Sequence, residues 1–376
     1  MSDHRIERAD IHVVHIPAKA VHSHGSGDVA GINAVLLELT TDTGLTGWGE
    51  ASPWPVFTGT VEGAATALEH HLSPLFLGAD PVQTECIMQR AEETLVAHPE
   101  AKAALECALL DLTGQITGLS LAEVLGGRCR EAIPLSFSVA NPDFEADLND
   151  IAQLWDDGVR LFKLKTGFNA HAFDIMRLEK LRSLYGDDIG LRIDYNQGLA
   201  AHDAIRHVRD LEAFRPDLVE QPVKRHERAA LAAITQAVDV PIMADESVFN
   251  PVEALEGASN RIADIFSLKI MKSGGLRRCL EVAAIARAAG IGVYGGCMFE
   301  TSIAHAAGAH LMAALPELRL GCEFYMSTYY ASADIADAPF PVKNGRVHVP
   351  QGPGLGVRPD TGKLAAHRIA HKSLKA

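Results

Sequence analysis

Short runs of apolar and β-branched residues alternate with longer helical segments from about Ile133 to about Ser327. The runs occupy residues 133–140, 159–167, 189–198, 216–223, 240–247, 263–275, 291–299 and 318–325. Strands that alternate with helices in this way pair in parallel and are buried. Seven or eight such units in roughly 200 residues favour a (β/α)8-type barrel over an open sheet.

The segments on either side of this region have a different pattern. Strand-like runs and then helices with a period of about 3.6 precede it, at residues 6–16, 32–51, 60–78 and 81–118. The tail that follows it is loop-rich. We therefore expect an α+β domain at 1–130, the barrel at 131–326, and a C-terminal segment at 327–376 that returns to the first domain.

Three acidic residues, Asp194, Glu220 and Asp245, stand near the ends of successive runs, 26 and then 25 residues apart. Each interval is one strand and one helix, so the side chains are expected at neighbouring strand ends, where barrel enzymes have their active sites. Carboxylates held together repel unless a cation neutralises them, and an all-oxygen set points to Mg²⁺ or Mn²⁺. The alternative is that each acid separately caps a helix or pairs with a surface lysine.

Three lysines, Lys163, Lys165 and Lys269, lie in the same runs, where barrel interiors normally hold Val, Ile and Leu. Lys163 and Lys165 are two apart, so they share one face of a strand. An ammonium beside another ammonium or a metal has a lowered pKa and serves as a general base near neutral pH. The alternative is that these lysines are salt-bridge partners of the three acids.

Together, these residue types predict the removal of a proton next to a carboxylate. The enolate that forms carries two negative oxygens, which a divalent cation and the ammonium of Lys163 stabilise. A neutral lysine takes or returns the proton. Two other classes stay open: an aldolase-like barrel in which Lys165 or Lys269 forms a Schiff base, and a barrel kept for binding without catalysis.

The ordered motifs of the chain resemble the enolase superfamily, and within it the muconate lactonizing enzyme subgroup. The matching barrel motifs are KLK at 163–165, DYNQ at 194–197, EQP at 220–222, ADES at 244–247 and LKIMKSGG at 268–275. YGGCMFE at 294–300 and GCEFY at 321–325 resemble the subgroup's last strands. AKAALECALLDLTGQITG at 101–118 resembles its capping-domain helix, and VPQGPGLGV at 349–357 resembles its tail. The resemblance covers nearly the whole chain.

This resemblance implies a modified TIM barrel, (β/α)7β, under an N-terminal α+β capping domain that the C-terminal tail completes, in a homo-oligomer. It implies Mg²⁺ as the cofactor, with Mn²⁺ as an alternative, and a small carboxylate as the substrate. The metal ligands implied are Asp194, Glu220 and Asp245. The catalytic residues implied are Lys165 and Lys269 as acid and base, Lys163 near the substrate carboxylate, and Glu323 as a proton donor.

Substrate specificity is expected in two loops of the capping domain, residues 19–31 and 51–60, whose glycines allow closure over a substrate. The candidate substrate contacts are His22, His24, Asp28 and Trp54 in these loops and Asn196 and Phe299 in the barrel motifs. Muconate needs a cation for its second carboxylate, and Lys19 is the only lysine or arginine in the two loops. Asp28 and Trp54 suit a cationic amine instead. We therefore expect dehydration or epimerisation of a small amino or imino acid, such as a hydroxyproline-like ring, with muconate-type cycloisomerisation as the alternative.

Charge and composition exclude several other kinds of partner. The formal net charge of −14 is spread along the chain, so nucleic acids and anionic membranes are poor partners. The N-terminus has no apolar signal-peptide core, and no run of about 18 apolar residues occurs, so the expected location is the cytoplasm. The six cysteines form no CxxC pair, and buried free thiols are expected in preference to disulfides or a zinc site.

Overall fold

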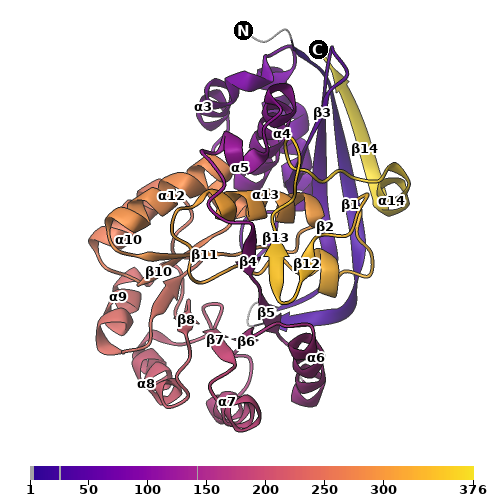
Figure 1. Ribbon diagram of the computed structural model, residues 1–376. Coiled ribbons are helices and arrows are strands. Elements are labelled where there is room, and N and C mark those ends of the chain that lie inside the picture. Colours follow the sequence, from indigo (N-terminus) through magenta and orange to yellow (C-terminus); the bar gives the residue numbers. More distant parts are fainter. Residues whose placement is uncertain (1–3, 25–26, 142) are drawn as a thin grey trace.

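The N-terminal part of the chain builds an antiparallel sheet with helices packed on it (Figure 1). A computed structural model describes residues 4–24, 27–141 and 143–376, and leaves the side chains of residues 21–28 undescribed. The sheet order is β14-β1-β2-β3, with β1 (Ile6–His24), β2 (Gly27–Thr41), β3 (Thr46–Ala51) and β14 (Arg368–Lys375). The helical segments are α1 (Val61–Thr66), η1 (Ala67–Leu72), α2 (Ser73–Phe76), η2 (Pro81–Gln83), α3 (Thr84–Thr94), α4 (Pro99–Thr117) and α5 (Leu121–Val124).

Strand β2 is buried on both faces, which explains its almost unbroken apolar run. Ala34 and Leu36 belong to the core that the cap shares with the barrel, whereas Val35, Leu37 and Leu39 belong to the core under the cap helices. Successive side chains of a strand point to opposite faces, so this one strand serves both cores. Hydrophobic packing therefore holds the cap directly against the barrel.

Strand β3 and helix α4 pack with almost no space between their backbones at Gly49. A Cβ added at Gly49 would lie 1.9 Å from the carbonyl oxygen of Ala104. We expect Gly49→Ala to lower the free energy of unfolding by about 3 kcal/mol, because backbone atoms must move to make room. Chemical denaturation measures this change. The control is Gly292→Ala, whose added Cβ meets its nearest neighbour at 3.5 Å, and equal losses in the two variants would contradict the prediction.

Seven strand–helix units follow the cap in the chain, and their arrangement can be followed in Figure 1. The parallel strands, in sheet order, are β11 (Gly292–Gly295), β10 (Ile265–Leu268), β9 (Ile242–Ala244), β8 (Leu218–Glu220), β7 (Gly190–Asp194), β6 (Leu161–Lys165) and β5 (Ser136–Val139). The helices that follow them are α6 (Phe144–Asp156), α7 (His171–Tyr185), α8 (Ala201–Glu212), α9 (Arg228–Ala237), α10 (Pro251–Ser259), α11 (Ile270–Ser273), α12 (Leu276–Ala288) and α13 (Ser302–Ala314).

Residues 321–323 close this sheet into a barrel. Cys322 forms parallel bridges to Leu135 on one side and to Gly295 on the other. The backbone N–H of Ser136 donates to the carbonyl oxygen of Cys322 at 2.7 Å, and that of Glu323 donates to the carbonyl oxygen of Gly295 at 3.0 Å. Seven strand–helix units and this eighth strand position confirm the predicted (β/α)7β barrel under an antiparallel cap.

Two segments differ from what the sequence pattern led us to expect. Residues 133–140, expected as one strand, split into β4 (Ala132–Pro134) and β5, and β4 joins a small sheet with β13 (Arg346–His348) and β12 (Val342–Lys343). Pro134 lacks an N–H, so a regular strand breaks readily there. The tail, expected to be rich in loops, also contains η3 (Met326–Tyr330), α14 (Thr361–His367) and β14, which pairs with β1 (Figure 1).

Candidate active site

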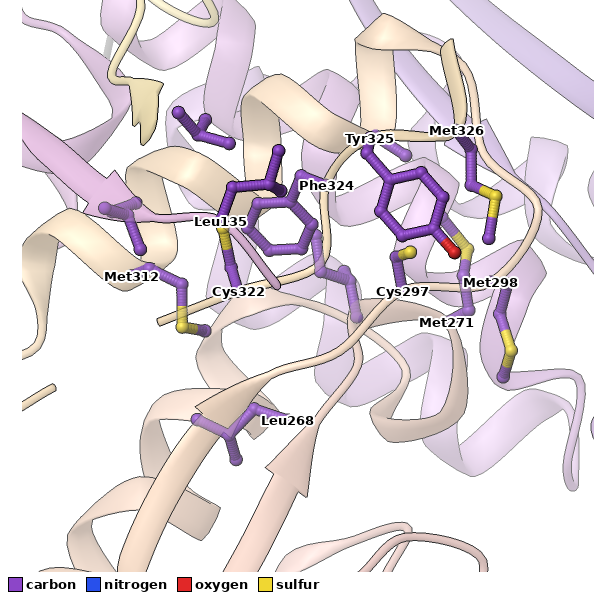
Figure 2. Packing of buried hydrophobic residues seen from close by; sticks show 14 of the residues in the cluster. Leu135, Leu268, Met271, Cys297, Met298, Met312, Cys322, Phe324, Tyr325 and Met326 are labelled. Atoms are coloured by element: carbon purple, nitrogen blue, oxygen red, sulfur yellow. The ribbon is translucent and has the colours of Figure 1, made fainter. Parts of the chain in front are cut away.

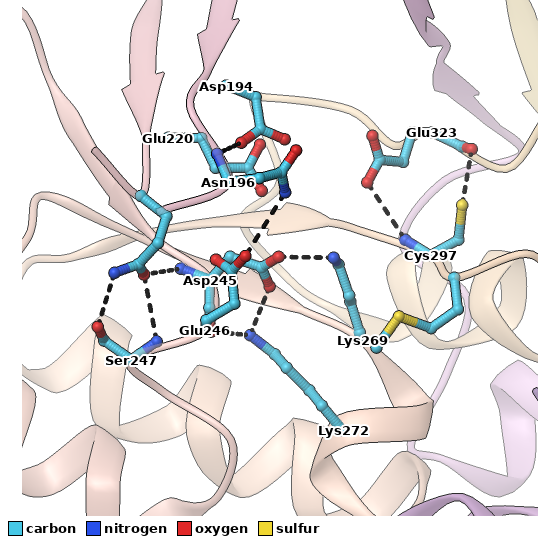
Figure 3. Close-up of polar contacts among 12 residues, drawn as sticks. Asp194, Asn196, Glu220, Asp245, Glu246, Ser247, Lys269, Lys272, Cys297 and Glu323 are labelled. Atoms are coloured by element: carbon cyan, nitrogen blue, oxygen red, sulfur yellow. Dashed lines mark hydrogen bonds and ion pairs between the residues drawn. The ribbon is translucent and has the colours of Figure 1, made fainter. Parts of the chain in front are cut away.

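Five of the predicted site residues lie at the carboxyl ends of five successive barrel strands. Lys165 ends β6, Asp194 ends β7, Glu220 ends β8, Asp245 follows β9 and Lys269 follows β10. The register pairs Lys165 with Asp194 and Asp194 with Glu220. The spacing of one strand and one helix therefore brings these side chains to one mouth of the barrel, and Figure 3 shows the group from Asp194 to Lys269.

Lys163 occupies the centre of this group. Its Nζ lies 2.6 Å from Oε2 of Glu323, 2.9 Å from Oε2 of Glu220 and 3.5 Å from Oδ2 of Asp194. Lys163 and Lys165 point to the same side of β6, because they are two residues apart on a strand. The closing segment of the barrel thus brings Glu323 to the same ammonium as two acids from the middle of the sheet.

The other lysines hold the remaining carboxylates. Nζ of Lys165 lies 2.6 Å from Oδ2 of Asp194 and 2.9 Å from Oδ1 of Asn196. Nζ of Lys269 lies 2.6 Å from Oδ2 of Asp245 and 4.7 Å from the ring centre of Phe57 in the cap. The lysines are therefore ion-pair partners of the acids, as the alternative interpretation of the sequence held.

The expected lowering of the lysine pKa values is wrong for two of these lysines. Burial by itself lowers the pKa of Lys163, but the carboxylates of Glu220, Glu323 and Asp194 hold that pKa well above its usual value. For Lys269 burial again lowers the pKa, and the nearby Asp245 overcomes this effect and raises it. The sequence argument counted neighbouring ammonium groups and a metal, whereas the nearest charges are carboxylates.

The chemistry of the three acids fits a hard dication. All their donors are oxygens, all three side chains are buried, and Oε1 of Glu220 is buried with no hydrogen-bond partner. Burial, together with the charge of Asp194, raises the pKa of Glu220 to about 8. Burial alone would raise the pKa of Asp245, but Lys269 and Lys272 hold it below its usual value. The oxygen set therefore suits Mg²⁺ or Mn²⁺ by donor type. A bound cation would stabilise the ionised form of Glu220 most, because this carboxylate has a raised pKa and an oxygen without a hydrogen-bond partner.

The three predicted ligands do not converge on one point in this arrangement. Donor atoms of a metal site lie close together, and the oxygens of these three acids do not all come within 4.8 Å of one another. In the described part of the chain, the trio of His, Cys, Asp or Glu side chains that meets this distance is Cys297, Glu300 and His305. Lys163 lies between Asp194 and Glu220, while Asp245 is held by Lys269 from the other side. A dication would therefore compete with these ammonium groups for the carboxylate oxygens.

Sequence reasoning missed several polar groups of the site. Nζ of Lys272 lies 2.9 Å from Oδ1 of Asp245 (Figure 3), and the buried Glu246 accepts a long hydrogen bond of 3.5 Å from Asn196. Lys272 follows Lys269 by three residues, one helical turn, in the motif LKIMKSGG, so the helical period was the signal that indicated it. Glu246 follows Asp245 directly, and a strand period would have placed it on the opposite side.

The predicted substrate contacts fall into two groups. Trp54 in the cap meets Phe299 after β11 edge to face, with ring centres 5.6 Å apart, so the second cap loop reaches the barrel beside the site. The backbones of His22, His24 and Asp28 lie in the paired strands β1 and β2, and their side chains lie outside the described part of the structure.

A buried carboxylate from the cap also anchors the barrel next to the site. Glu50 in β3 accepts hydrogen bonds from the backbone N–H groups of Thr301 and Ala304, at 2.9 and 3.0 Å, and from the hydroxyl of Ser52 at 2.5 Å. Burial raises the pKa of Glu50. This contact ties the start of α13 to the cap, and nothing in the spacing of the motifs predicted it.

Comparison with known proteins identifies the family. Residues 9–126 match the mandelate racemase / muconate lactonizing enzyme N-terminal domain, and residues 147–363 match the enolase C-terminal domain-like family. An L-Ala-D/L-Glu epimerase of Bacillus subtilis is 34% identical over 86% of this chain and 88% of its own length. A chloromuconate cycloisomerase of Cupriavidus necator is 33% identical over 96% of this chain and 98% of its own length.

The solved structures agree with these matches. A muconate cycloisomerase from Azorhizobium caulinodans superposes with a TM-score of 0.87 and 44% identity over the full length of both chains. A capped barrel with acids and lysines at its strand ends defines an isomerase or lyase of the enolase class. The chain belongs to the enolase superfamily, in its mandelate racemase / muconate lactonizing enzyme group.

Within the described residues, no helix combines the length and apolarity needed to cross a membrane.

Proposed function

We propose that this enzyme removes the proton next to a substrate carboxylate with the help of Mg²⁺, through an enediolate. The observation that carries this proposal is the row of Asp194, Glu220 and Asp245 on three neighbouring strands, with Lys165 and Lys269 on the strands at either end. The three carboxylates would hold the cation, with Mn²⁺ as an alternative. When bound, it would supply positive charge to the substrate carboxylate as negative charge develops there.

The three lysines have different proposed roles, which follow from their positions in the site. Lys165 and Lys269 stand on opposite sides of the acids, so each is placed to exchange a proton at one face of the substrate carbon. The raised pKa of Lys163 keeps it cationic, which suits stabilisation of the developing charge. The carboxylates that raise the pKa of Lys269 are also proposed metal ligands, and sharing them with a dication weakens that effect. Glu323, 2.6 Å from Nζ of Lys163, is a candidate proton donor.

The substrate we favour is a small amino or imino acid, undergoing epimerisation or dehydration. A cavity of about 340 Å³ lies between Lys19 of the cap, the end of β5 and α6, and Tyr325 lines it, whereas the acids and lysines of the barrel mouth are not among its described lining residues. Its wall also carries Asp147, Asp150 and Asp157, against the single ammonium of Lys19. Burial raises the pKa of Asp147 to about 7, so part of this acid is uncharged at neutral pH, and the negative charge that remains suits a substrate with an amine.

Muconate-type cycloisomerisation is the second candidate, and two observations favour it. The solved structure at 44% identity is that of a muconate cycloisomerase, and the chloromuconate cycloisomerase matches nearly the whole chain. Lys19 lines the cavity, where its ammonium is able to meet a second carboxylate. The epimerase from Bacillus subtilis, 34% identical over 86% of this chain, supports the amino-acid alternative.

A panel of substrates in D₂O distinguishes these functions. Proline and hydroxyproline analogues, other amino-acid derivatives and cis,cis-muconate are each incubated with the protein and Mg²⁺. We expect Mg²⁺-dependent deuterium incorporation at Cα of an amino or imino acid, without muconate turnover. Lactone formation from muconate without Cα exchange would establish the second candidate. Activity that survives EDTA and is trapped by borohydride would overturn both and indicate a Schiff-base enzyme.

Trp54 provides a smaller test of where the substrate binds. We expect Trp54→Ala to raise KM by about three- to tenfold with little change in kcat, because one aromatic contact contributes about 0.5–1.5 kcal/mol. Trp54→Phe is the matched control and should restore most of the affinity. Steady-state kinetics on the accepted substrate measures both, and an unchanged KM in Trp54→Ala would place the substrate elsewhere.

A further inference from the structure

Three unlike side chains form a cluster between β11 and α13. Cys297 follows β11, Glu300 precedes α13, and His305 lies in the first turn of that helix. The three residues are buried, with relative exposures of 6%, 2% and 0%. A carboxylate oxygen, a sulfur and a ring nitrogen from these residues lie within 4.8 Å of one another.

The hydrogen bonds of the cluster leave one strong polar atom unused. Nδ1 of His305 lies 3.0 Å from the hydroxyl of Ser327, whereas Nε2 is buried with no hydrogen-bond partner. One oxygen of Glu300 accepts from the backbone N–H of Met298 at 2.9 Å. A buried polar atom without a partner is destabilising, so the orphaned Nε2 of His305 points to a missing partner.

Ion pairing within the cluster does not supply that partner. Burial raises the pKa of Glu300 to about 8 and holds the pKa of the Cys297 thiol well above its usual value. Burial lowers the pKa of His305 to about 3. The imidazole and the thiol are therefore neutral at pH 7, and the carboxyl is mainly so.

The donor set is that of a zinc-type cation. Thiolate, imidazole and carboxylate are the usual ligands of Zn²⁺, whereas Mg²⁺ prefers oxygen alone. Two anionic ligands would cancel the charge of a dication, which limits the cost of burying it. We propose that Cys297, Glu300 and His305 bind a divalent cation of the Zn²⁺ class, at a site distinct from the proposed Mg²⁺ ligands Asp194, Glu220 and Asp245. The thiol and carboxyl protons pass to the solvent when the cation binds.

The position of this site connects it to the closing segment of the barrel. The thiol of Cys297 lies 3.1 Å from the carbonyl oxygen of Glu323, and its backbone N–H donates to Oε1 of Glu323 at 3.4 Å (Figure 3). Figure 2 shows Cys297 near Tyr325 in the buried cluster that also includes Met326. A cation held here would fix the loop after β11 and the start of α13 against residues 323–326, so it is a structural ion that supports the position of Glu323.

Cobalt(II) is the probe, because a thiolate bound to cobalt absorbs in the near ultraviolet and an all-oxygen site does not. The parent is the full chain carrying Cys86→Ser and Cys129→Ser, since these two thiols are exposed. Excess Mg²⁺ competes at the carboxylates, and long incubation allows the buried site to open. We expect one equivalent of cobalt with thiolate absorption and a melting temperature that rises with cobalt concentration.

Three variants locate the ligands. Cys297→Ser should remove the absorption and the stabilisation, and His305→Gln should weaken cobalt binding by at least about tenfold. Cys279→Ser, which changes another fully buried thiol, should leave both unchanged. Circular dichroism checks folding, and His305→Gln supplies the test if Cys297→Ser does not fold. The proposal is overturned if the folded parent shows no thiolate–cobalt absorption, or if the absorption persists in Cys297→Ser or His305→Gln at unchanged affinity.

Discussion

Lys165→Ala is expected to remove proton exchange at one face of the substrate carbon and to lower kcat for the net reaction by about 10²–10⁴-fold, the usual contribution of a general acid or base. Lys165 approaches the site from β6 and Lys269 from the end of β10, with the strands of the three acids between them. In the proposed mechanism, alanine at position 165 removes the group that exchanges the proton on that side. Lys269→Ala should have the same effect at the opposite face.

Isotope exchange separates these two roles from a general loss of structure. Each enantiomer of an accepted substrate is incubated in D₂O with each variant, and mass spectrometry follows deuterium at Cα. One enantiomer should exchange only in Lys165→Ala and the other only in Lys269→Ala. Lys180→Ala, at an exposed lysine of α7, is the control and should behave as the parent. Exchange of both enantiomers at the parent rate in Lys165→Ala would refute the assignment.

Asp245→Asn is expected to abolish turnover and to weaken Mg²⁺ binding, because the amide lacks the charge that a hard cation requires. It should also lower the free energy of unfolding by about 3 kcal/mol in the absence of Mg²⁺, since Lys269 and Lys272 lose a buried ionic partner. The pKa of Asp245 lies below its usual value in the folded state. The stability advantage of the parent is therefore present at neutral pH and is lost as the pH falls through that folded-state pKa.

Calorimetric Mg²⁺ titration and urea denaturation at several pH values measure these effects. Asp239→Asn, at an exposed aspartate just before β9, is the control and should change neither quantity. The prediction separates the catalytic and structural roles, because Mg²⁺ affinity reports the metal site and metal-free denaturation reports the ion pairs. A variant that binds Mg²⁺ as tightly as the parent and keeps its activity would contradict the proposed ligand set.

Much of the barrel was predictable because its signals are local. The interval between Asp194, Glu220 and Asp245 is one strand and one helix, and a parallel sheet converts that interval into adjacent strand ends. The period of two in β6 likewise put Lys163 and Lys165 on one face. The closing segment was harder, because Cys322 makes only isolated bridges whose partners, Leu135 and Gly295, are far away in the sequence.

The sequence by itself determined the alternation of strands and helices in the barrel and the row of acids and lysines, because side-chain direction and helix–strand alternation follow from periodicities within a few residues. Only the tertiary structure decided that carboxylates surround Lys163 and Lys269 and raise their pKa values, that Glu50 of the cap binds the start of α13, and that Cys297, Glu300 and His305 meet. These features depend on distances between segments that are distant in the chain, and both electrostatic and coordination energies change steeply with such distances.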